Sequence, residues 1–262
     1  MSTVTKYEPG TPCWVELATP DLGAAKPFYT ALFGWDYAVG PEETAFYTMP
    51  QLGGQNVAGM MTQGEDERAQ GVPPMWRTYV SVTSADETIK KVAGLGGTVL
   101  MEPFDVMDVG RMAALLDTEN AMIAIWQPKQ HIGAGIVNET GTFGWSELTT
   151  RDPDGAKKFY SGLFGWGTHD HPEYYEWQVS GRAVGGMLPM TPEMGDMPPC
   201  WTTYFMVDDC DATVKTVKAE GGAVFVEPRD IPDVGRFAVV ADPQGAMFAI
   251  IKMAEGHETS PS

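Results

Sequence analysis

The sequence predicts an α+β protein with two tandem domains, each built from a pair of βαβββ units, which makes four units in all. The first observation behind this prediction is an internal duplication. Residues 10–35 match residues 141–166 at 15 of 26 positions, and residues 76–125 match residues 201–250 at 24 of 50. The second is the order of hydrophobic patterns, because a strand, a helix and several short strands follow one another twice in each copy.

The opening strand and helix of each copy are the most clearly patterned elements. WVELATPD at 14–21 alternates, which puts Trp14 and Glu16 on the same face of a half-buried strand. Apolar residues then follow at helical spacing up to Gly34, a typical helix terminator. Pro27 predicts a helix start at residue 23 or 24, since its ring is tolerated in a first turn. A second helix is expected over 84–97 in the first copy and over 208–222 in the second.

The same patterns set the predicted boundaries. The domains cover residues 10–128 and 141–253, joined by a Gly-containing linker over 129–140 and followed by a tail over 254–262. Duplication within one chain allows the two domains to pack as an internal pseudo-dimer. We therefore expect a monomer or at most a weak homodimer.

The composition restricts the partners. Seventeen Lys and Arg against 35 Asp and Glu give a formal net charge of -18, which repels nucleic acid and anionic membrane surfaces. The sequence shows neither a leader pattern nor a run of 18 apolar residues. These features predict a cytoplasmic protein that binds neither nucleic acid nor membranes and takes a small-molecule ligand.

Two motifs occur once in each copy, in the same order. D-x-x-x-A-x-x-F-Y and then L-F-G-W follow the first strand, and D-x-x-x-A-M-x-A-I lies at the last strand. With two βαβββ units per domain, this arrangement resembles the vicinal oxygen chelate superfamily of glyoxalases, bleomycin-resistance proteins and extradiol dioxygenases. It is most similar to the tandem two-domain proteins of actinobacterial type, often labelled hydroxylases or antigens. The resemblance implies a cupped mixed sheet in each domain.

Metal-dependent members of that superfamily hold a divalent ion with inward-facing His and Glu side chains. The resemblance places the first-strand ligand at Trp14 and Trp145 and the last-strand ligand at Ala124 and Ala249. The remaining ligands fall near Trp76 or Arg77, Trp201 or Thr202, Gly59 and Gly186. Because divalent ions need carboxylate, imidazole or thiolate donors, no cofactor is expected. A divalent metal remains an alternative if the strand register slips by one residue, which would bring Glu16 and Glu147 into the ligand positions.

The repeated Trp-x-Glu places an indole beside a carboxylate. A buried acid needs a partner, and the Arg of the repeated DVGR motif is the expected one, Arg111 for Glu16 and Arg236 for Glu147. This pair is either a structural ion pair or a device that orients a ligand while the Trp stacks on it. The candidate ligand-binding residues are Trp14, Glu16, Trp76, Arg111, Trp145, Glu147, Trp201 and Arg236, and Glu16 and Glu147 are also the catalytic candidates.

The His-Asp-His at 169–171 has no counterpart in the first copy. In an extended segment His169 and His171 would share a face and could bind a metal or act as an acid–base pair. A surface loop is the competing interpretation, because the segment ends at Pro172.

The predicted function is metal-independent binding of a small hydrophobic or aromatic molecule, for sequestration or resistance. Eight Trp and 16 Met suit an adaptable apolar cavity. The alternative is an enzyme of the same superfamily. It would be a metal-free isomerase, cyclase or hydroxylase-like protein acting on a secondary metabolite, or a glyoxalase-type lyase with His169, His171 and Glu147 as nonstandard ligands. A purely structural protein with filled cavities is a third possibility.

Overall fold

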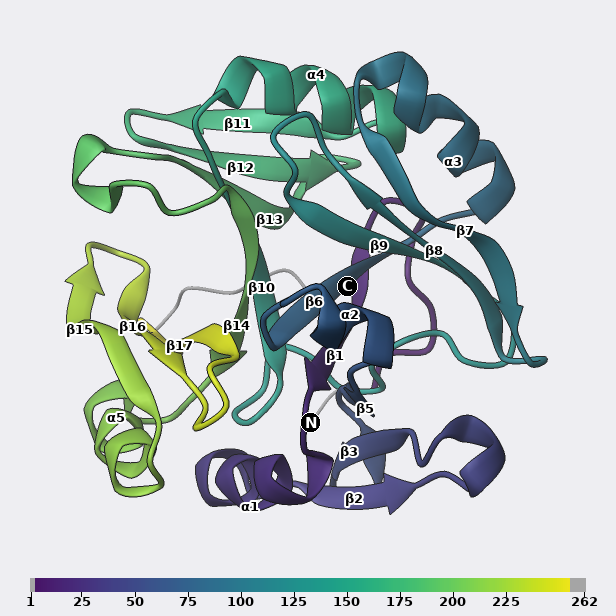
Figure 1. Cartoon of the computed structure of the whole chain (residues 1–262). Coiled ribbons are helices and arrows are strands. Elements are labelled where there is room, and N and C mark those ends of the chain that lie inside the picture. The colour runs from purple at the N-terminus through teal and green to yellow at the C-terminus, as the bar shows by residue number, and fades with distance from the viewer. Residues whose placement is uncertain (1–2, 255–262) are drawn as a thin grey trace.

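The computed structural model describes residues 3–254, which form two curved half-sheets, one from each sequence copy (Figure 1). A pairing of Met75 with Met247 joins the two halves into one 17-stranded sheet. Copy 1 denotes residues 10–128 and copy 2 residues 141–253. In space, the copy 1 strands follow the order β2(Asp36–Val39), β3(Thr48–Leu52), β5(Gly59–Thr62), β1(Pro12–Thr19), β6(Met75–Ser81), β9(Met122–Pro128), β8(Gly110–Leu116) and β7(Thr98–Val106), while the short β4(Gln55–Asn56) pairs with β3.

Copy 2 repeats this order. Its strands are β11(Gly167–His171), β12(Tyr174–Val179), β13(Arg182–Pro189), β10(Phe143–Thr150), β14(Cys200–Met206), β17(Met247–Met253), β16(Gly235–Ala241) and β15(Ala223–Ile231). The helices are α1(Leu22–Phe33), α2(Glu65–Ala69), α3(Ala85–Val92), α4(Pro153–Phe164) and α5(Cys210–Ala219). This is the predicted α+β class with four strand–helix–strand units.

The register at the centre of each sheet determines which side chains share a face. Across the antiparallel pair β1–β6, Trp14 lies opposite Tyr79, and Glu16 lies opposite Arg77. Directly opposed side chains point to the same side, so these four define what we call the inner face. Their neighbours Leu17 and Trp76 point to the other side, the helix face. In copy 2 the inner face carries Trp145, Glu147, Thr202 and Tyr204.

Helix α1 begins earlier than the sequence suggested. Asp21 is its N-cap, and its carboxylate accepts a hydrogen bond from the Ala24 backbone N–H at 3.0 Å. The cap fixes the start at Leu22, which leaves Pro27 inside the helix instead of in its first turn. Gly34 ends the helix in the left-handed conformation, as the sequence predicted.

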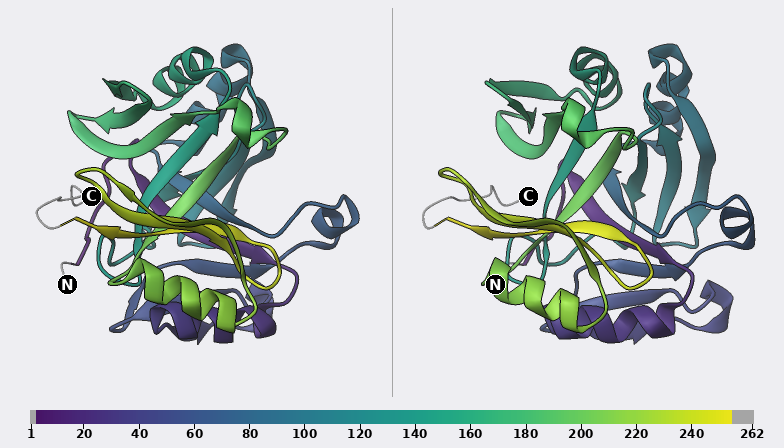
Figure 2. Two further views of the ribbon diagram at one scale, coloured as in Figure 1. Left: turned by 90° about the vertical axis from the view of Figure 1, so that its left-hand side faces the viewer. Right: turned by 60° about the vertical axis from the view of Figure 1, so that its left-hand side comes forward.

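The helices pack across the two copies. Helix α1 lies against α5, and α3 lies against α4, and Figure 2 shows α5 in light green beside α1 in purple. Each main apolar cluster therefore mixes the copies. One joins Phe28 and Phe33 of copy 1 to Phe205 and Phe248 of copy 2, and the other joins residues such as Ile123 and Leu115 to Phe159 and Trp166. The two copies thus share their hydrophobic cores.

Two buried hydrogen-bond chains tie the copies together. The indole N–H of Trp76 donates to the Tyr29 hydroxyl at 3.0 Å, and that hydroxyl donates to Asp242 of copy 2 at 3.0 Å. The reciprocal chain runs from Trp201 to Tyr160 at 2.8 Å and then to Asp117 of copy 1 at 2.9 Å. The repeated Tyr and Asp of the two sequence motifs therefore meet between copies.

No helix within residues 3–254 is long and apolar enough to cross a membrane. The predicted C-terminal tail lies outside the described residues, except for residue 254.

Candidate functional site

The inner face of copy 1 holds a hydrogen-bonded cluster around Glu16. Its two carboxylate oxygens accept hydrogen bonds from the hydroxyls of Tyr47 at 2.7 Å and Tyr79 at 2.8 Å. The indole N–H of Trp14 donates to the Tyr47 hydroxyl at 3.2 Å. Glu16 is only 6% exposed. The repeated Trp-x-Glu is thus one edge of a Trp–Tyr–Glu–Tyr network.

Copy 2 builds the same network from equivalent strands. Tyr204 donates to Glu147 at 2.8 Å, and the Trp145 indole donates to the Tyr174 hydroxyl at 2.9 Å. Tyr174 also hydrogen-bonds to Glu147. Trp145 is more exposed than Trp14, because the His131 ring of the linker lies edge-on against Trp14 at 4.6 Å between ring centroids.

A glycine makes room for each cluster. A Cβ added to Gly59 would lie 3.0 Å from the Trp14 indole nitrogen and would overlap the Tyr47 hydroxyl. At Gly186, a Cβ would lie 2.9 Å from the Trp145 nitrogen and overlap Tyr174. No side chain fits at either position unless the cluster moves.

The expected pairing of Glu16 with Arg111 and of Glu147 with Arg236 is wrong. Arg111 donates to Asp86 at 2.8 and 2.9 Å, and Arg236 donates to Asp211 at 2.5 and 3.0 Å. Strand alternation explains this result, since each DVGR arginine points to the helix face, where the first turn of α3 or α5 supplies the aspartate.

Trp76 and Trp201 also lie on the helix face, buried in the chains that tie the copies together. The structure therefore gathers only Trp14 and Glu16, or Trp145 and Glu147, from the candidate ligand-binding set. Sequence reasoning missed the tyrosines. Tyr79 and Tyr204 had a usable signal, because WRTY and WTTY recur at the same offset.

Arg77 is the cation beside Glu16 on the copy 1 inner face. It lies directly opposite Glu16, is 7% exposed, and pairs with Glu67 of α2. In copy 2 the corresponding residue is Thr202. The cation is therefore placed differently in the two copies: Arg229 of β15 lies on the copy 2 inner face opposite Phe237, and its charge opposes the rise in the pKa of Glu147.

A sequence model of the Glyoxalase/Bleomycin resistance protein/Dioxygenase superfamily matches residues 13–125 and again residues 142–250. The chain belongs to this superfamily. One relative is "Putative glyoxylase CFP32" of Mycobacterium tuberculosis (strain CDC 1551 / Oshkosh). It is 45% identical to this chain over 260 residues, which cover 95% of this chain and 97% of the relative. "Anthracycline biosynthesis protein DauV" of Streptomyces sp. (strain C5) is 34% identical over 269 residues, with 97% of each chain covered.

Solved structures of the superfamily share the fold. The Mn(II)-bound glyoxalase from Novosphingobium aromaticivorans aligns with a TM-score of 0.64 at 16% identity, covering 93% of this chain and 82% of that one. The 2,3-dioxygenase LapB from Pseudomonas sp. KL28 gives a TM-score of 0.62 at 11% identity, covering 99% and 97%. The predicted family and fold are confirmed, and at these identities the likeness concerns the fold alone.

The residues present do not fit the superfamily's divalent metal. Within residues 3–254 there is no group of three or more His, Cys, Asp or Glu side chains that could hold a metal ion. On the inner face Glu16 is surrounded by tyrosine hydroxyls and an indole, which are poor ligands for hard divalent cations. Ala124 lies beside Tyr79, so the last strand supplies no donor there.

His169 and His171 lie on an exposed strand, not in the surface loop considered above. Their rings stack at 4.7 Å on β11, and His171 lies 3.3 Å from Glu176. Strand β11 is separated from β10 by β12 and β13, so neither histidine reaches Glu147. The proposed lyase ligand set of His169, His171 and Glu147 does not assemble.

Burial raises the pKa of Glu16 and of Glu147, against the opposing effect of the tyrosine hydrogen bonds. For each acid, the folded state holds the proton more tightly than the unfolded state. From about pH 4.5 up to the raised pKa, the folded chain therefore binds more protons, and the free energy of unfolding falls as pH rises. We expect Glu16→Gln to make this fall shallower.

Urea unfolding between pH 4.5 and 8 measures this effect. Glu87→Gln is the control, because Glu87 is an exposed, ion-paired carboxylate. An unchanged pH dependence in Glu16→Gln would mean that Glu16 is ionised throughout this range.

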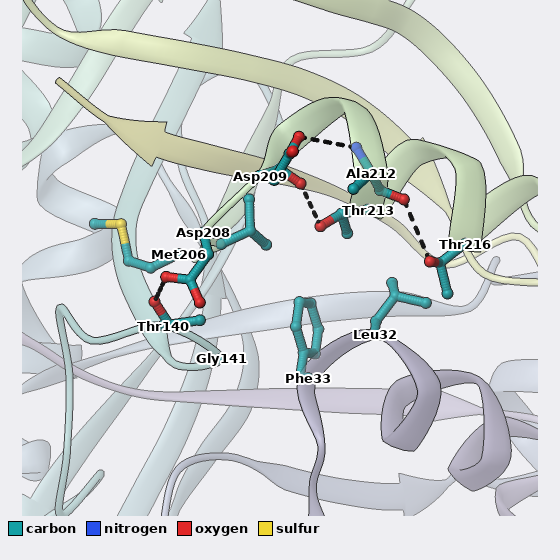
Figure 3. A pocket seen from close by; sticks show the side chains of 11 residues that line it. Leu32, Phe33, Thr140, Gly141, Met206, Asp208, Asp209, Ala212, Thr213 and Thr216 are labelled. Atoms are coloured by element: carbon teal, nitrogen blue, oxygen red, sulfur yellow. Dashed lines mark hydrogen bonds between the residues drawn. The ribbon is translucent and has the colours of Figure 1, made fainter.

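A separate pocket of about 250 Å³ lies where the copies meet, between the end of α1 and the start of α5 (Figure 3). Leu32 and Phe33 line one side. On the other, Asp208 accepts a hydrogen bond from Thr140 at 2.5 Å, and Asp209 caps α5. Its polar groups already have partners, so this pocket is a crevice between packed helices and is not part of the Glu16 or Glu147 cluster.

Proposed function

We propose that the protein binds a small planar aromatic molecule on the inner face of copy 1 without a metal ion. The observation that carries this proposal is the Trp–Tyr–Glu–Tyr cluster at the position where metal-dependent relatives of this fold would need ligands. In copy 1 the cluster is buried, with Trp14 4% and Tyr79 2% exposed, and forms a fixed aromatic base for this face. Contact with a flat ligand would come from the side chains that remain exposed around it.

The rest of the copy 1 inner face is apolar and adaptable. Five methionines point to it, all of them at least partly exposed: Met61, Met75, Met101, Met112 and Met122. Phe104 lies beside them and is 42% exposed. Unbranched, polarizable thioethers re-pack around flat ligands at small cost. At the corresponding places copy 2 has Leu188, Cys200, Val226, Phe237 and Met247, which favours copy 1 as the binding copy.

The name of one relative supports this ligand class. DauV is named for anthracycline biosynthesis, and an anthracycline carries a planar, oxygenated polycyclic ring system. The ligand proposed for the present chain is of that kind, a fused aromatic ring system with carbonyl or hydroxyl groups.

Anthraquinone is a suitable neutral probe. We expect saturable binding by isothermal titration calorimetry, with the same affinity before and after treatment with EDTA. Ala124→Val should weaken binding about tenfold or more, since the added methyl groups overpack the inner face beside Tyr79. Ala249→Val is the matched control, because Ala249 lies beside Tyr204 in copy 2. Binding that appears only after a divalent metal is added, or equal losses in both variants, would contradict the proposal.

The second candidate is a metal-free enzyme. It is favoured by the buried Glu16 carboxyl, whose raised pKa suits transfer of a proton to or from a bound ketone. Deuterium exchange of an aromatic ketone in D2O tests it. Under this alternative, Glu16→Gln should abolish exchange while anthraquinone binding persists, and exchange that is unchanged in Glu16→Gln would rule Glu16 out as the base.

A further inference from the structure

Arg77 is a buried cation whose hydrogen-bonding capacity is only partly used. Its Nη2 pairs with Glu67, and its Nη1 lies 4.0 Å from the Met61 sulfur, a weak acceptor. Its Nε is buried and has no hydrogen-bond partner in the described part of the chain. A guanidinium carries five N–H donors, and leaving a buried one unpaired is unfavourable.

The unused donor and the used donor lie on the same edge of the guanidinium. Nε–H and the outer N–H of Nη2 form the fork that grips a carboxylate with two parallel hydrogen bonds. Glu67 engages Nη2 and leaves Nε unpaired. A carboxylate that approached from the inner face could satisfy both donors.

The internal partner is less buried than Arg77, although its other oxygen also accepts a hydrogen bond from the Gly64 backbone N–H at 3.3 Å. Glu67 belongs to the five-residue helix α2, and its side chain is 33% exposed, against 8% for Arg77. The other nearby acid, Glu16, has its oxygens taken by Tyr47 and Tyr79. Glu67 is therefore the group that an incoming anion would displace.

Arg77 is not part of the duplicated framework. The Trp–Tyr–Glu–Tyr cluster is present in both copies, yet the residue opposite Glu147 is Thr202. Where copy 1 has α2, copy 2 has only a single helical turn over Pro192–Met194. Copy 2 does carry an inner-face arginine, but Arg229 belongs to β15 and lies over the Phe237 ring at 4.9 Å. A buried arginine directly opposite the Glu of the cluster is found in copy 1 alone, and this placement points to a role in recognition.

We propose that the copy 1 site binds an aromatic carboxylate, and that Arg77 determines this specificity by taking the ligand carboxylate in place of Glu67, through Nε and Nη2. This inference rests on the proposed function, since it names the polar group of the planar ligand. The net charge of -18 does not oppose it, because charges more than about 10 Å away are largely screened at 0.1 M salt.

The test compares anthraquinone-2-carboxylate with the neutral anthraquinone-2-carboxamide by calorimetry at 0.1 M salt. The wild-type protein should bind the carboxylate about tenfold or more tightly than the amide. Arg77→Gln should remove that preference by lowering the affinity for the carboxylate much more than the affinity for the amide. Glu67→Gln should do the opposite and tighten carboxylate binding several-fold, because the competing internal carboxylate is gone.

The opposite signs distinguish recognition from a structural ion pair, since breaking a structural pair from either side would weaken binding in the same direction. Glu87→Gln, with the same change of charge on the surface, should alter neither affinity. Equal affinities of the wild-type protein for the two probes, or shifts of the same sign in Arg77→Gln and Glu67→Gln, would overturn the inference.

The outcomes also separate this inference from the proposed function. If neither probe binds, the proposed function fails; if both bind equally and independently of Arg77, only the carboxylate specificity fails. Should Arg77→Gln not fold, Glu67→Gln decides alone, with tighter carboxylate binding as support and unchanged binding as refutation.

Discussion

Residues 1–128, expressed without the rest of the chain, are expected not to yield a folded monomer. The helix face of copy 1 is covered by copy 2, where α5 packs on α1 and Asp242 accepts the hydrogen bond of Tyr29. Removing copy 2 would expose Phe28, Tyr29 and Trp76, each less than 5% exposed in the whole chain. Exposed apolar surface of this extent drives self-association.

Size-exclusion chromatography with light scattering, combined with urea unfolding, provides the measurement. The full chain should be monomeric and unfold in one transition, because both apolar clusters span both copies. The fragment should be a dimer, aggregated or unfolded, and mixing it with residues 129–262 should restore a folded complex. A monomeric fragment with its own cooperative transition would show that the copies are independent domains.

The sequence was most informative where a pattern depends on one element alone. Alternation in β1 placed Trp14 and Glu16 on one face, and the structure confirms it, because a strand has only two faces. The repeat likewise predicted the two-copy organisation. The two motifs that occur once in each copy predicted the superfamily. Local periodicity was sufficient for these features.

Features that depend on packing between elements were not predictable in the same way. Arg111 was assigned to Glu16 because both residues were charged and repeated. The face of the sheet to which Arg111 points depends on how β8 pairs with β9, and this register cannot be read from the sequence. Tyr47 reaches Glu16 from the irregular segment before β3. Tyr47 and its counterpart Tyr174 are 127 residues apart, whereas Tyr79 and Tyr204 are 125 residues apart, so one alignment of the repeats does not match both pairs. The recurrence of Trp76 reflected its contact with Tyr29 and the interface between copies, and not a ligand site.

Replacing Asp117 by Ala should destabilise the whole chain by about 3 kcal/mol or more, since removing a shared acceptor leaves several donors unpaired. One Asp117 oxygen accepts the backbone N–H groups of Glu119 and Ala121, each at 2.9 Å, and the other accepts the Tyr160 hydroxyl. Asp117 is 4% exposed, so little water can replace it. The loss is expected in the single global transition, measured by urea unfolding.

A double-mutant cycle with Tyr160→Phe isolates the contact between copies. Tyr160→Phe removes only the bridging hydroxyl and should cost about 1–2 kcal/mol, with strong coupling to Asp117→Ala. Asp242→Ala and Tyr29→Phe form the matched cycle at the other chain, where the same bonds run in the reciprocal direction. Equal coupling in the two cycles would mean that the duplicated Asp and Tyr hold the copies together in both places. Additive effects would mean that each Asp stabilises only the turn, and each Tyr only the helix, of its own copy. In the first case the Asp and Tyr motifs that identify the superfamily serve stability here, and recognition is left to the inner face, where the two copies differ.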